Sequence, residues 1–97
     1  MIAHSFHPDA ALEFEEAALF YESRVTGLGK SFAAEIERTV SLIREFPDAG
    51  AAFEGNLRRV RVDRFPYLIV YRRDAEALVI VAVSHQRRRP GYWRQRR

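Results

Sequence analysis

A dense set of arginines, interleaved with two aromatic rings, holds the side chains best suited to chemistry. The arginines gather in the second half of the chain: Arg58, Arg59, Arg61, Arg64, Arg87, Arg88, Arg89, Arg94, Arg96 and Arg97. Guanidinium groups bind phosphates and carboxylates, while Tyr92 and Trp93 are able to stack on bases or anchor a protein contact. Such a set also stabilises the charge of a scissile phosphate without a metal. Two alternatives stay open: a solvated basic face, and a Trp93 ring packed over a sheet beneath Arg96.

His85 is the second candidate, because it closes an apolar run and opens the basic tail. Imidazole has an ordinary pKa near neutrality, so His85 is able to act as a general acid or base. The alternative, which we favour, is a structural histidine whose ring hydrogen-bonds the backbone at a strand end. Ser84 is no catalytic partner for it, because adjacent residues of a strand point to opposite faces.

Charge is divided unevenly along the chain. Residues 1–54 carry four Lys and Arg against ten Asp and Glu, a balance of −6, whereas residues 55–97 carry twelve Arg against three acids, a balance of +9. The basic half predicts an anionic partner, either nucleic acid or an acidic peptide. The chain has no cysteine, which excludes disulfides, zinc–thiolate sites and thiol catalysis. With no apolar run long enough to span a membrane and no signal-peptide pattern, we expect a cytoplasmic protein that acts away from membranes.

The remaining polar residues give little sign of a metal or cofactor site. His4 and His7 are three residues apart, but they straddle the end of a short strand, and we interpret them as partly exposed polar residues. No glycine-rich phosphate loop is present. Four glutamates lie mostly off the apolar stripe of the first predicted helix, and we interpret them as a solvated helix face: Glu13, Glu15, Glu16 and Glu22. We expect no metal and no cofactor.

Hydrophobic spacing predicts a strand and two helices in the first half of the chain. Residues 2–6 alternate apolar and polar side chains, which is typical of a short strand. Helical spacing follows Pro8, which suits a first turn, and stops at Gly27, which suits a left-handed end. A connection at Leu28–Gly29 leads to a second helix, which ends at Phe46–Pro47. So short a connection forces the two helices into an antiparallel hairpin.

Strand signals dominate the second half. After a loop over residues 48–56, strand-like runs at residues 57–64, 67–72 and 78–84 predict a three-stranded antiparallel meander, followed by a basic tail. Whether residues 94–97 form a helix, a strand or a frayed end stays open. We therefore expect one α+β domain over residues 1–97. The two central runs are apolar on both faces, whereas a helical hairpin covers one face of a small sheet. Either the tail or a partner chain must cover the other face, and both alternatives stay open.

Three stretches of the chain together resemble a known protein family. They are residues 21–32, YESRVTGLGKSF; residues 64–71, RFPYLIVY; and residues 83–96, VSHQRRRPGYWRQR. In order and spacing they resemble the RelE/ParE superfamily of bacterial toxins, the poison halves of type II toxin–antitoxin pairs. The third stretch is the most specific, because it matches the family's ending of spaced His, Arg, Pro, Trp and Arg. One departure is Arg89, where that ending usually has an acid, which leaves Arg88 without a neighbour to pair with.

The resemblance implies a toxin that inhibits growth and stabilises plasmids, but branches of the superfamily act differently. Ribonuclease members typically carry a catalytic arginine three residues before the tyrosine of the strand that ends in VY. The equivalent position here is Leu68, which disfavours a nuclease. The FPY block and the PxxW ending resemble the ParE branch, whose studied members poison DNA gyrase without being enzymes. Our leading prediction is therefore a ParE-like toxin that acts by binding, with gyrase as its expected target.

Two alternative functions stay open. The first is a ribosome-dependent messenger-RNA endonuclease that works without a metal. In it, Arg61 and Arg88 hold the phosphate while His85 or Tyr92 transfers protons. The second is a basic interaction module with no toxicity.

The resemblance also implies two macromolecular partners. The target, either DNA gyrase or the ribosome with its messenger RNA, is expected to contact Arg59, Arg61, Arg88, Arg89, Tyr92, Trp93 and Arg96. A small acidic antitoxin that folds on binding is expected to cover the helical hairpin and the sheet. Its predicted contacts are Phe14, Tyr21, Tyr67, Ile69 and Tyr71.

Overall fold

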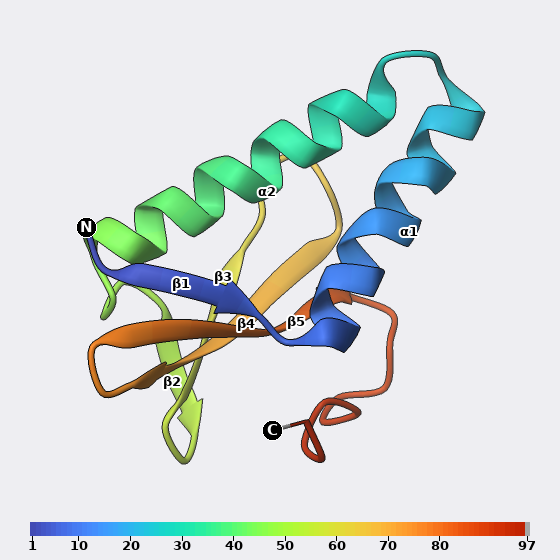
Figure 1. Cartoon of the computed structure of the whole chain (residues 1–97). Helices are drawn as coiled ribbons and strands as arrows, with labels where there is room; N and C mark the ends of the chain where they lie inside the picture. Colours follow the sequence, from blue (N-terminus) through green and yellow to red (C-terminus); the bar gives the residue numbers. More distant parts are fainter. Residues whose placement is uncertain (97) are drawn as a thin grey trace.

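The computed structural model describes residues 1–96 as two helices packed on a five-stranded sheet (Figure 1). The elements are β1 (Ala3–Phe6), α1 (Pro8–Arg24), α2 (Leu28–Glu45), β2 (Ala51–Glu54), β3 (Leu57–Arg61), β4 (Tyr67–Asp74) and β5 (Ala77–His85). The strand order is β1–β5–β4–β3–β2, with β1 parallel to β5 and the other pairs antiparallel. The predicted α+β class is confirmed, and the predicted meander corresponds to β3–β4–β5. Within residues 1–96, no helix is long and apolar enough to cross a membrane.

The bend of the helical hairpin lies earlier in the chain than the sequence predicted, at residues 25–27. Gly27 adopts a left-handed conformation with φ of 88°, as expected, but the predicted connection at Leu28–Gly29 is wrong, because α2 already begins at Leu28. The Glu22 carboxylate explains the early start, since it accepts hydrogen bonds from the backbone N–H groups of Gly27 at 2.8 Å and Gly29 at 3.0 Å. An acid at this place satisfies donors that a helix start leaves free. Glu22 is exposed, as predicted, and its two hydrogen bonds also stabilise the bend between the helices.

The predicted loop over residues 48–56 is wrong in part, because it contains β2. This strand pairs with β3 through a bulge, and the two are joined by the two-residue turn Gly55–Asn56, in which Gly55 has φ of 55°. Such a pair between two runs is a hairpin signal. It was missed because Ala51 to Glu54 contains no β-branched residue. The strand predicted over residues 57–64 also ends earlier than expected, at Arg61. Arg64 has a φ of 71°, and it turns the chain before Pro66.

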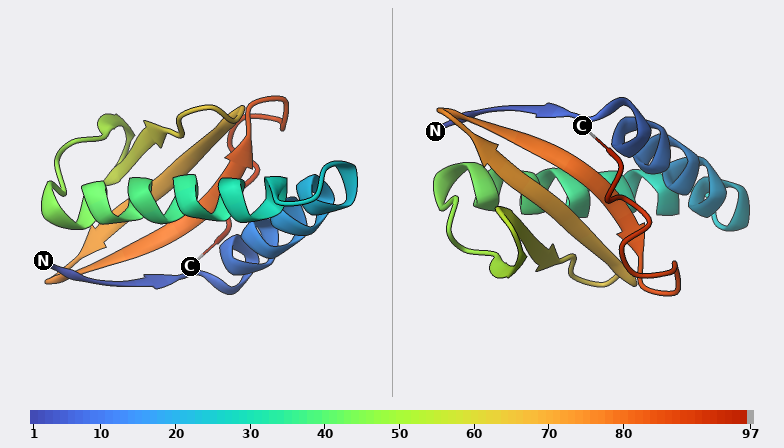
Figure 2. Two further views of the ribbon diagram at one scale, coloured as in Figure 1. Left: turned by 90° about the horizontal axis from the view of Figure 1, so that it is seen from above. Right: turned by 90° about the horizontal axis from the view of Figure 1, so that it is seen from below.

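Two apolar clusters lie on opposite faces of the sheet. On one face the buried side of α2, including Phe32, Ile36 and Ile43, packs against Ile69 and Ile80. On the other face Val70, Val81 and Ala82 pack against Trp93. Figure 2 shows α2 across one face and the C-terminal segment across the other. The sequence left open whether the tail or a partner covers the second face, and in the structure the tail does so.

The tail is ordered by specific contacts up to Arg96. The Trp93 side chain is 5% exposed and meets the Phe53 ring edge-on at 6.1 Å between centroids. Arg94 Nε donates to Glu54 Oε1 at 2.8 Å. These contacts answer for residues 94–96 the question that the sequence left open, and Arg97 lies outside the described residues. The alternative that Trp93 packs over the sheet is confirmed, but Arg96 stacks on a different ring: its guanidinium lies 5.0 Å from the centroid of Tyr92.

Trp93→Ala is expected to lower the free energy of unfolding by about 3–5 kcal/mol, because it removes the largest side chain from the second face. Trp93→Phe should cost much less, since it keeps a ring there and removes an indole Nε1–H that is buried without a hydrogen-bond acceptor among the described residues. Urea denaturation measures both. Gln95→Ala, at an exposed neighbour, is the control. A loss below about 1 kcal/mol for Trp93→Ala would show that the tail does not seal this face.

Candidate functional site

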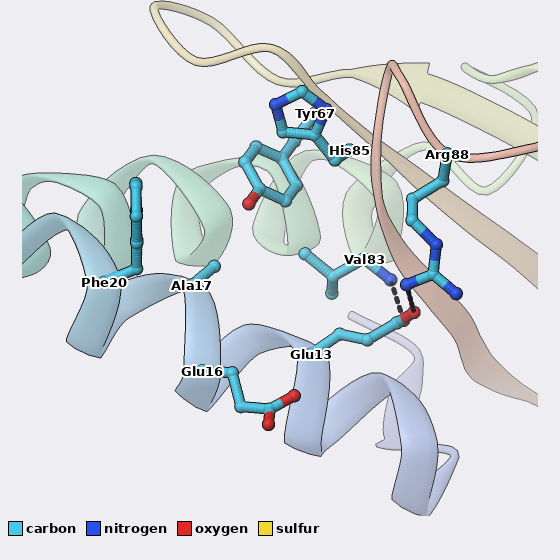
Figure 3. Close-up of a pocket in the computed structure, with 8 residues that line it drawn as sticks. All are labelled: Glu13, Glu16, Ala17, Phe20, Tyr67, Val83, His85 and Arg88. Carbon is cyan, nitrogen blue, oxygen red and sulfur yellow. Dashed lines mark hydrogen bonds and ion pairs between the residues drawn. The ribbon is translucent and has the colours of Figure 1, made fainter.

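A hollow of about 280 Å³ lies where α1, the end of the sheet and the start of the tail meet (Figure 3). Its lining comes from all three: Glu13, Glu16, Ala17 and Phe20 from α1, Tyr67, Val83 and His85 from the sheet, and Arg88 from the tail. In Figure 3 the Arg88 side chain reaches across the hollow toward Glu13. The hollow thus brings two of the predicted functional residues, His85 and Arg88, beside a carboxylate of α1.

Glu13 is the centre of a compact hydrogen-bonded group, which we call the Glu13 cluster: Glu13, Val83, Arg88, Tyr92 and Arg96. Glu13 Oε1 accepts from the Val83 backbone N–H at 3.0 Å and from Arg96 Nη1 at 2.7 Å. Glu13 Oε2 accepts from the Tyr92 hydroxyl at 2.6 Å and from Arg96 Nη2 at 2.9 Å. The side chains of Arg96 and Glu13 are only 12% and 13% exposed. This bidentate, well-shielded pair joins the first helix to the last described residue.

The cluster also completes the edge of β5. β1 pairs with β5 only as far as Ile80, so the next part of β5 has no neighbouring strand on that side. Arg96 Nη1 donates to the Val81 carbonyl at 3.0 Å, and Glu13 accepts from the Val83 N–H. In a longer β1, the next residues would offer β5 one backbone N–H donor and one carbonyl acceptor. Here Arg96 is the donor and Glu13 is the acceptor. The ion pair therefore takes the place of the missing strand residue for the Val81 carbonyl and the Val83 N–H.

Tyr92 links the cluster to the basic tail. Its ring lies under the Arg88 guanidinium, which is 3.9 Å from the ring centroid, and Arg96 lies at 5.0 Å. Burial, together with the hydrogen bond that its hydroxyl donates to Glu13, raises the pKa of Tyr92 to about 12. The hydrogen bonds and nearby charge of Glu13 raise the pKa of Arg96 above its ordinary value. Both side chains therefore keep their protons at neutral pH.

The interpretation of Glu13 as part of a solvated helix face is wrong. Its side chain turns inward because it stands three residues after Ala10 and four before Ala17, and both alanines are buried. Residues at these spacings share one face of a helix. That spacing was the available signal. Glu13 was assigned to the surface from its charge, before its partners in the tail were known. Glu15 and Glu16 are exposed, as predicted.

The four residues of the nuclease alternative do not come together. His85 and Arg88 line one hollow, and Tyr92 packs beneath Arg88. Arg61 lines a different hollow, between α2 and β3, with Glu35 and Asp63. Its register partner in β4 is Leu68, which in turn pairs with Ser84, so Arg61 lies two strands away from the end of β5. The Tyr92 hydroxyl is held by Glu13 and its pKa is far from neutral.

His85 has the backbone hydrogen bond that the structural interpretation expects. Its Nδ1 accepts from the Arg87 backbone N–H at 3.0 Å, and its ring meets Tyr67 edge-on at 5.1 Å. An Nδ1 that accepts leaves the proton of the neutral ring on Nε2. His85 is therefore held in place by its neighbours while one nitrogen stays available to the hollow.

The seven residues predicted to contact a target fall into two groups. Arg59, Arg61 and Arg89 are exposed, and within residues 1–96 none of the three forms an ion pair. Arg59 lies 4.9 Å from the centroid of the Phe53 ring, on the face that the tail covers. Arg88 is half exposed, at 54%, and lies 3.8 Å from Glu13. Glu13 thus supplies the acid that the sequence lacks beside Arg88.

The other members of that set are structural in this fold. Trp93 is 5% exposed, and Arg96 is engaged by Glu13, so neither side chain is available to a partner while the tail stays in place. Tyr92 is half-buried between them and the sheet. The inclusion of Trp93 and Arg96 as contact residues is corrected by this burial, whereas the contact role of the half-buried Tyr92 stays a prediction.

The predicted antitoxin contacts divide in the same way. Phe14, Tyr21 and Tyr67 are half-buried at the rim of the first cluster. Ile69 and Tyr71 are 0% and 1% exposed, so they belong to the core and are withdrawn from the contact surface. Tyr71 also has a structural role, since its hydroxyl donates to the Pro47 carbonyl at 2.7 Å.

The two histidines near the start of the chain, His4 and His7, have different surroundings. His7 Nδ1 accepts from the Asp9 backbone N–H at 3.0 Å and so caps α1. His4 is exposed, and partial burial together with the charge of Arg44 lowers its pKa. In the part of the chain that the structure describes, no three His, Cys, Asp or Glu side chains gather as metal ligands would.

Glu13→Gln is expected to lower the free energy of unfolding by about 2–4 kcal/mol, because it removes the bidentate counter-charge of the shielded Arg96 and leaves it only the more exposed Asp9, whose Oδ2 is 3.8 Å from Arg96 Nε. Thermal and urea denaturation measure the loss, and amide exchange at Val83 should become faster. Glu16→Gln makes the same change at an exposed position one turn away and should be nearly neutral. Equal stability of the two variants would show that the Glu13 cluster does not hold the tail.

The raised pKa of Tyr92 predicts that the free energy of unfolding falls at alkaline pH. Its pKa is raised to about 12 from an ordinary value of 10.0, so its neutral form is favoured by folding. That contribution is complete below pH 10 and disappears as the pH rises toward about 12. Tyr92→Phe lacks the titrating group, so its stability should fall less than that of the wild type over this range. Parallel pH profiles for the two proteins would contradict the geometry.

The family described as “ParE toxin of type II toxin-antitoxin system, parDE” matches residues 5–90. A search of curated proteins finds no match. Among solved structures, the “Chromosomal ParDE TA system from P. aeruginosa” superposes with a TM-score of 0.74 at 16% identity, covering 88% of this chain and 96% of that one. At that identity the superposition shows a shared fold, and the family match covers most of the chain. The chain therefore belongs to the ParE family of type II toxin–antitoxin toxins.

Proposed function

We propose that this toxin arrests bacterial growth by binding DNA gyrase, and that a cognate antitoxin silences it. Family membership supports the toxin class. The observation that supports this mode of action is a group of exposed arginines on β3 and at the start of the tail that form no ion pair among the described residues. Arg59 and Arg61 project from β3, and Arg89 follows the β5 strand end.

These arginines support binding to an anionic or acidic macromolecular surface. Their guanidinium groups are in solvent, where they steer association and form bidentate contacts. Arg59 is also pre-positioned by its stacking over Phe53. The cations that the fold has already committed, such as Arg94 to Glu54 and Arg96 to Glu13, are outside this surface. A target that binds Arg59, Arg61 and Arg89 would leave the core and the ion pairs that hold the tail undisturbed.

Binding is favoured over nucleolytic cleavage by the arrangement of the remaining residues. A metal-independent nuclease needs cations, an acid and a base around one phosphate. Arg61 is two strands away from His85, and Tyr92 donates its hydroxyl to Glu13. With its pKa at about 12, Tyr92 is poorly suited to proton transfer near neutral pH. His85 and Arg88 alone remain in the hollow.

The same chain is proposed to contact its antitoxin through the rim residues Phe14, Tyr21 and Tyr67. These three rings are partly exposed and belong to one aromatic group: Tyr21 and Tyr67 lie 6.4 Å apart between centroids. Aromatic rims of this kind are common anchors of protein interfaces. Localisation in the cytoplasm, where gyrase and the antitoxin would be met, is part of the proposal.

Regulated expression in a bacterium tests the toxin, and a supercoiling assay with purified gyrase tests its target. The wild type is expected to stop growth and inhibit supercoiling. The triple variant Arg59→Gln, Arg61→Gln, Arg89→Gln should keep its thermal stability and lose inhibition by about tenfold or more, as expected for several lost charge contacts.

The matched control is the triple variant Arg24→Gln, Lys30→Gln, Arg73→Gln, which removes the same charge at exposed positions outside β3 and the tail. It should inhibit nearly as well as the wild type. Growth arrest with unimpaired supercoiling and cleaved messenger RNA would replace gyrase binding with the nuclease alternative. Normal growth on expression of soluble protein would contradict the toxic function.

A further inference from the structure

The turns at the end of the tail enclose a hollow with a cationic lining. The hollow has a volume of about 470 Å³, which lies within the range of small-molecule sites. Its lining residues are Arg89, Pro90, Gly91, Tyr92, Arg94 and Gln95. In Figure 1 these turns lie below the sheet, on the side opposite α2. Among the described residues, the lining holds two arginines and no acid, so the hollow favours an anionic ligand.

Arg94 is oriented so that one edge of its guanidinium group is free. Its Nε and Nη2 donate to the Glu54 carboxylate, at 2.8 and 3.1 Å. Its Nη1 donates to no acceptor among the described residues and lies where a Cβ on residue 91 would stand. Gly91 has φ of 83° and no side chain, so it allows both the turn and this close approach. The ion pair therefore presents the Nη1 donors at the wall of the hollow.

Further donors come from the backbone and from Arg89. Gly91 and Gln95 both line the hollow, and neither backbone N–H donates to an acceptor within residues 1–96. Arg89 is exposed and forms no ion pair in that range. Between them Trp93 is 5% exposed, which fixes the turns on the sheet before any ligand binds. An oxyanion satisfies several donors of this kind at once, and donors already in place cost less to order.

The charges around the hollow indicate a doubly charged ligand. Two carboxylates contact its lining, since Glu54 accepts from Arg94 and Glu13 accepts from the Tyr92 hydroxyl. Four described arginines line the hollow or lie over the Tyr92 ring: Arg88, Arg89, Arg94 and Arg96. The surplus of two positive charges suits a phosphate monoester, which carries up to two negative charges on three terminal oxygens. A carboxylate or a phosphodiester carries only one.

We propose that this hollow binds the phosphate group of a phosphate monoester. Arg89 and the free edge of Arg94 hold the phosphate oxygens, together with the backbone N–H groups of Gly91 and Gln95. Tyr92 contacts the organic part of the ligand. Because Arg89 also belongs to the surface proposed for the target, a bound ester would compete with that target. This last consequence rests on the proposed function, whereas the binding site itself does not.

An NMR titration of the isotope-labelled, full-length protein at constant ionic strength tests the proposal. The probes are inorganic phosphate, adenosine monophosphate, O-phosphoserine, acetate, and a thymidine dinucleotide whose single phosphate is a diester. The first three are expected to shift the amide signals of Gly91 and Gln95 and the Nε–H signal of Arg94. Acetate and the diester should bind about tenfold more weakly. Whichever of the two monoesters binds more tightly assigns the source, either a nucleotide or a phosphorylated residue.

Variants of the arginines supply the controls. Arg89→Gln with Arg94→Gln should weaken adenosine monophosphate by about tenfold or more. Arg24→Gln with Arg73→Gln removes the same charge at exposed positions away from the tail and should change the affinity by less than about twofold. Arg89→Gln alone removes no ion pair among the described residues, so it keeps the test valid if the double variant unfolds.

Four results would overturn the proposal. They are unchanged Gly91 and Gln95 signals, binding of acetate as tight as that of phosphate, binding of the diester tighter than that of the monoesters, and equal weakening by the two double variants. An acidic protein segment would give the second result, and a nucleic-acid backbone would give the third. Because the readout is binding to the purified protein, its failure leaves toxicity and gyrase inhibition to be judged separately.

Discussion

The ion pair between Glu13 and Arg96 is the constraint on which the rest of this structure depends. It joins α1 to the end of the tail across 83 residues of sequence, with two hydrogen bonds of 2.7 and 2.9 Å between them. The same two side chains satisfy the backbone of β5 where β1 stops. Because Arg96 is fixed there, the preceding turn lays Tyr92 and Trp93 against the sheet, and the second apolar face is closed. A buried pair of this kind stabilises only because its remaining donors and acceptors are also satisfied.

This arrangement divides the arginines of the basic half into two classes. Arg94 and Arg96 are held by carboxylates of β2 and α1, Arg72 pairs with Asp74, and Arg58 donates to the Gly50 carbonyl at 2.7 Å. Such cations build the fold. Arg59, Arg61 and Arg89 are exposed and form no ion pair among the described residues. The net charge of residues 55–97 therefore overstates the cationic surface that these residues present. The second face of the sheet is covered by the tail of the same chain.

Much of the fold was readable from the sequence because local patterns determine it. The helical spacing after Pro8, the left-handed Gly27 and the alternating runs after Leu57 each reflect a constraint within a few residues. β2 was missed because its residues favour no strand on their own, and its pairing depends on β3. Glu13 was misplaced for a related reason: its surroundings are formed by residues 70 to 83 positions away, and no local pattern contains them. Ile69 and Tyr71 were assigned to a partner because alternation does not say which face of a two-faced strand meets the protein's own helices.

The central claim is that Glu13 and Arg96 hold the tail on the sheet as a coupled pair. A double-mutant cycle with Glu13→Gln and Arg96→Gln, measured by urea denaturation, tests it most directly. The structure predicts a coupling free energy of about 2–3 kcal/mol, since either substitution alone removes the same interaction. A coupling within about 0.5 kcal/mol of zero would contradict it, because the two side chains would then contribute independently.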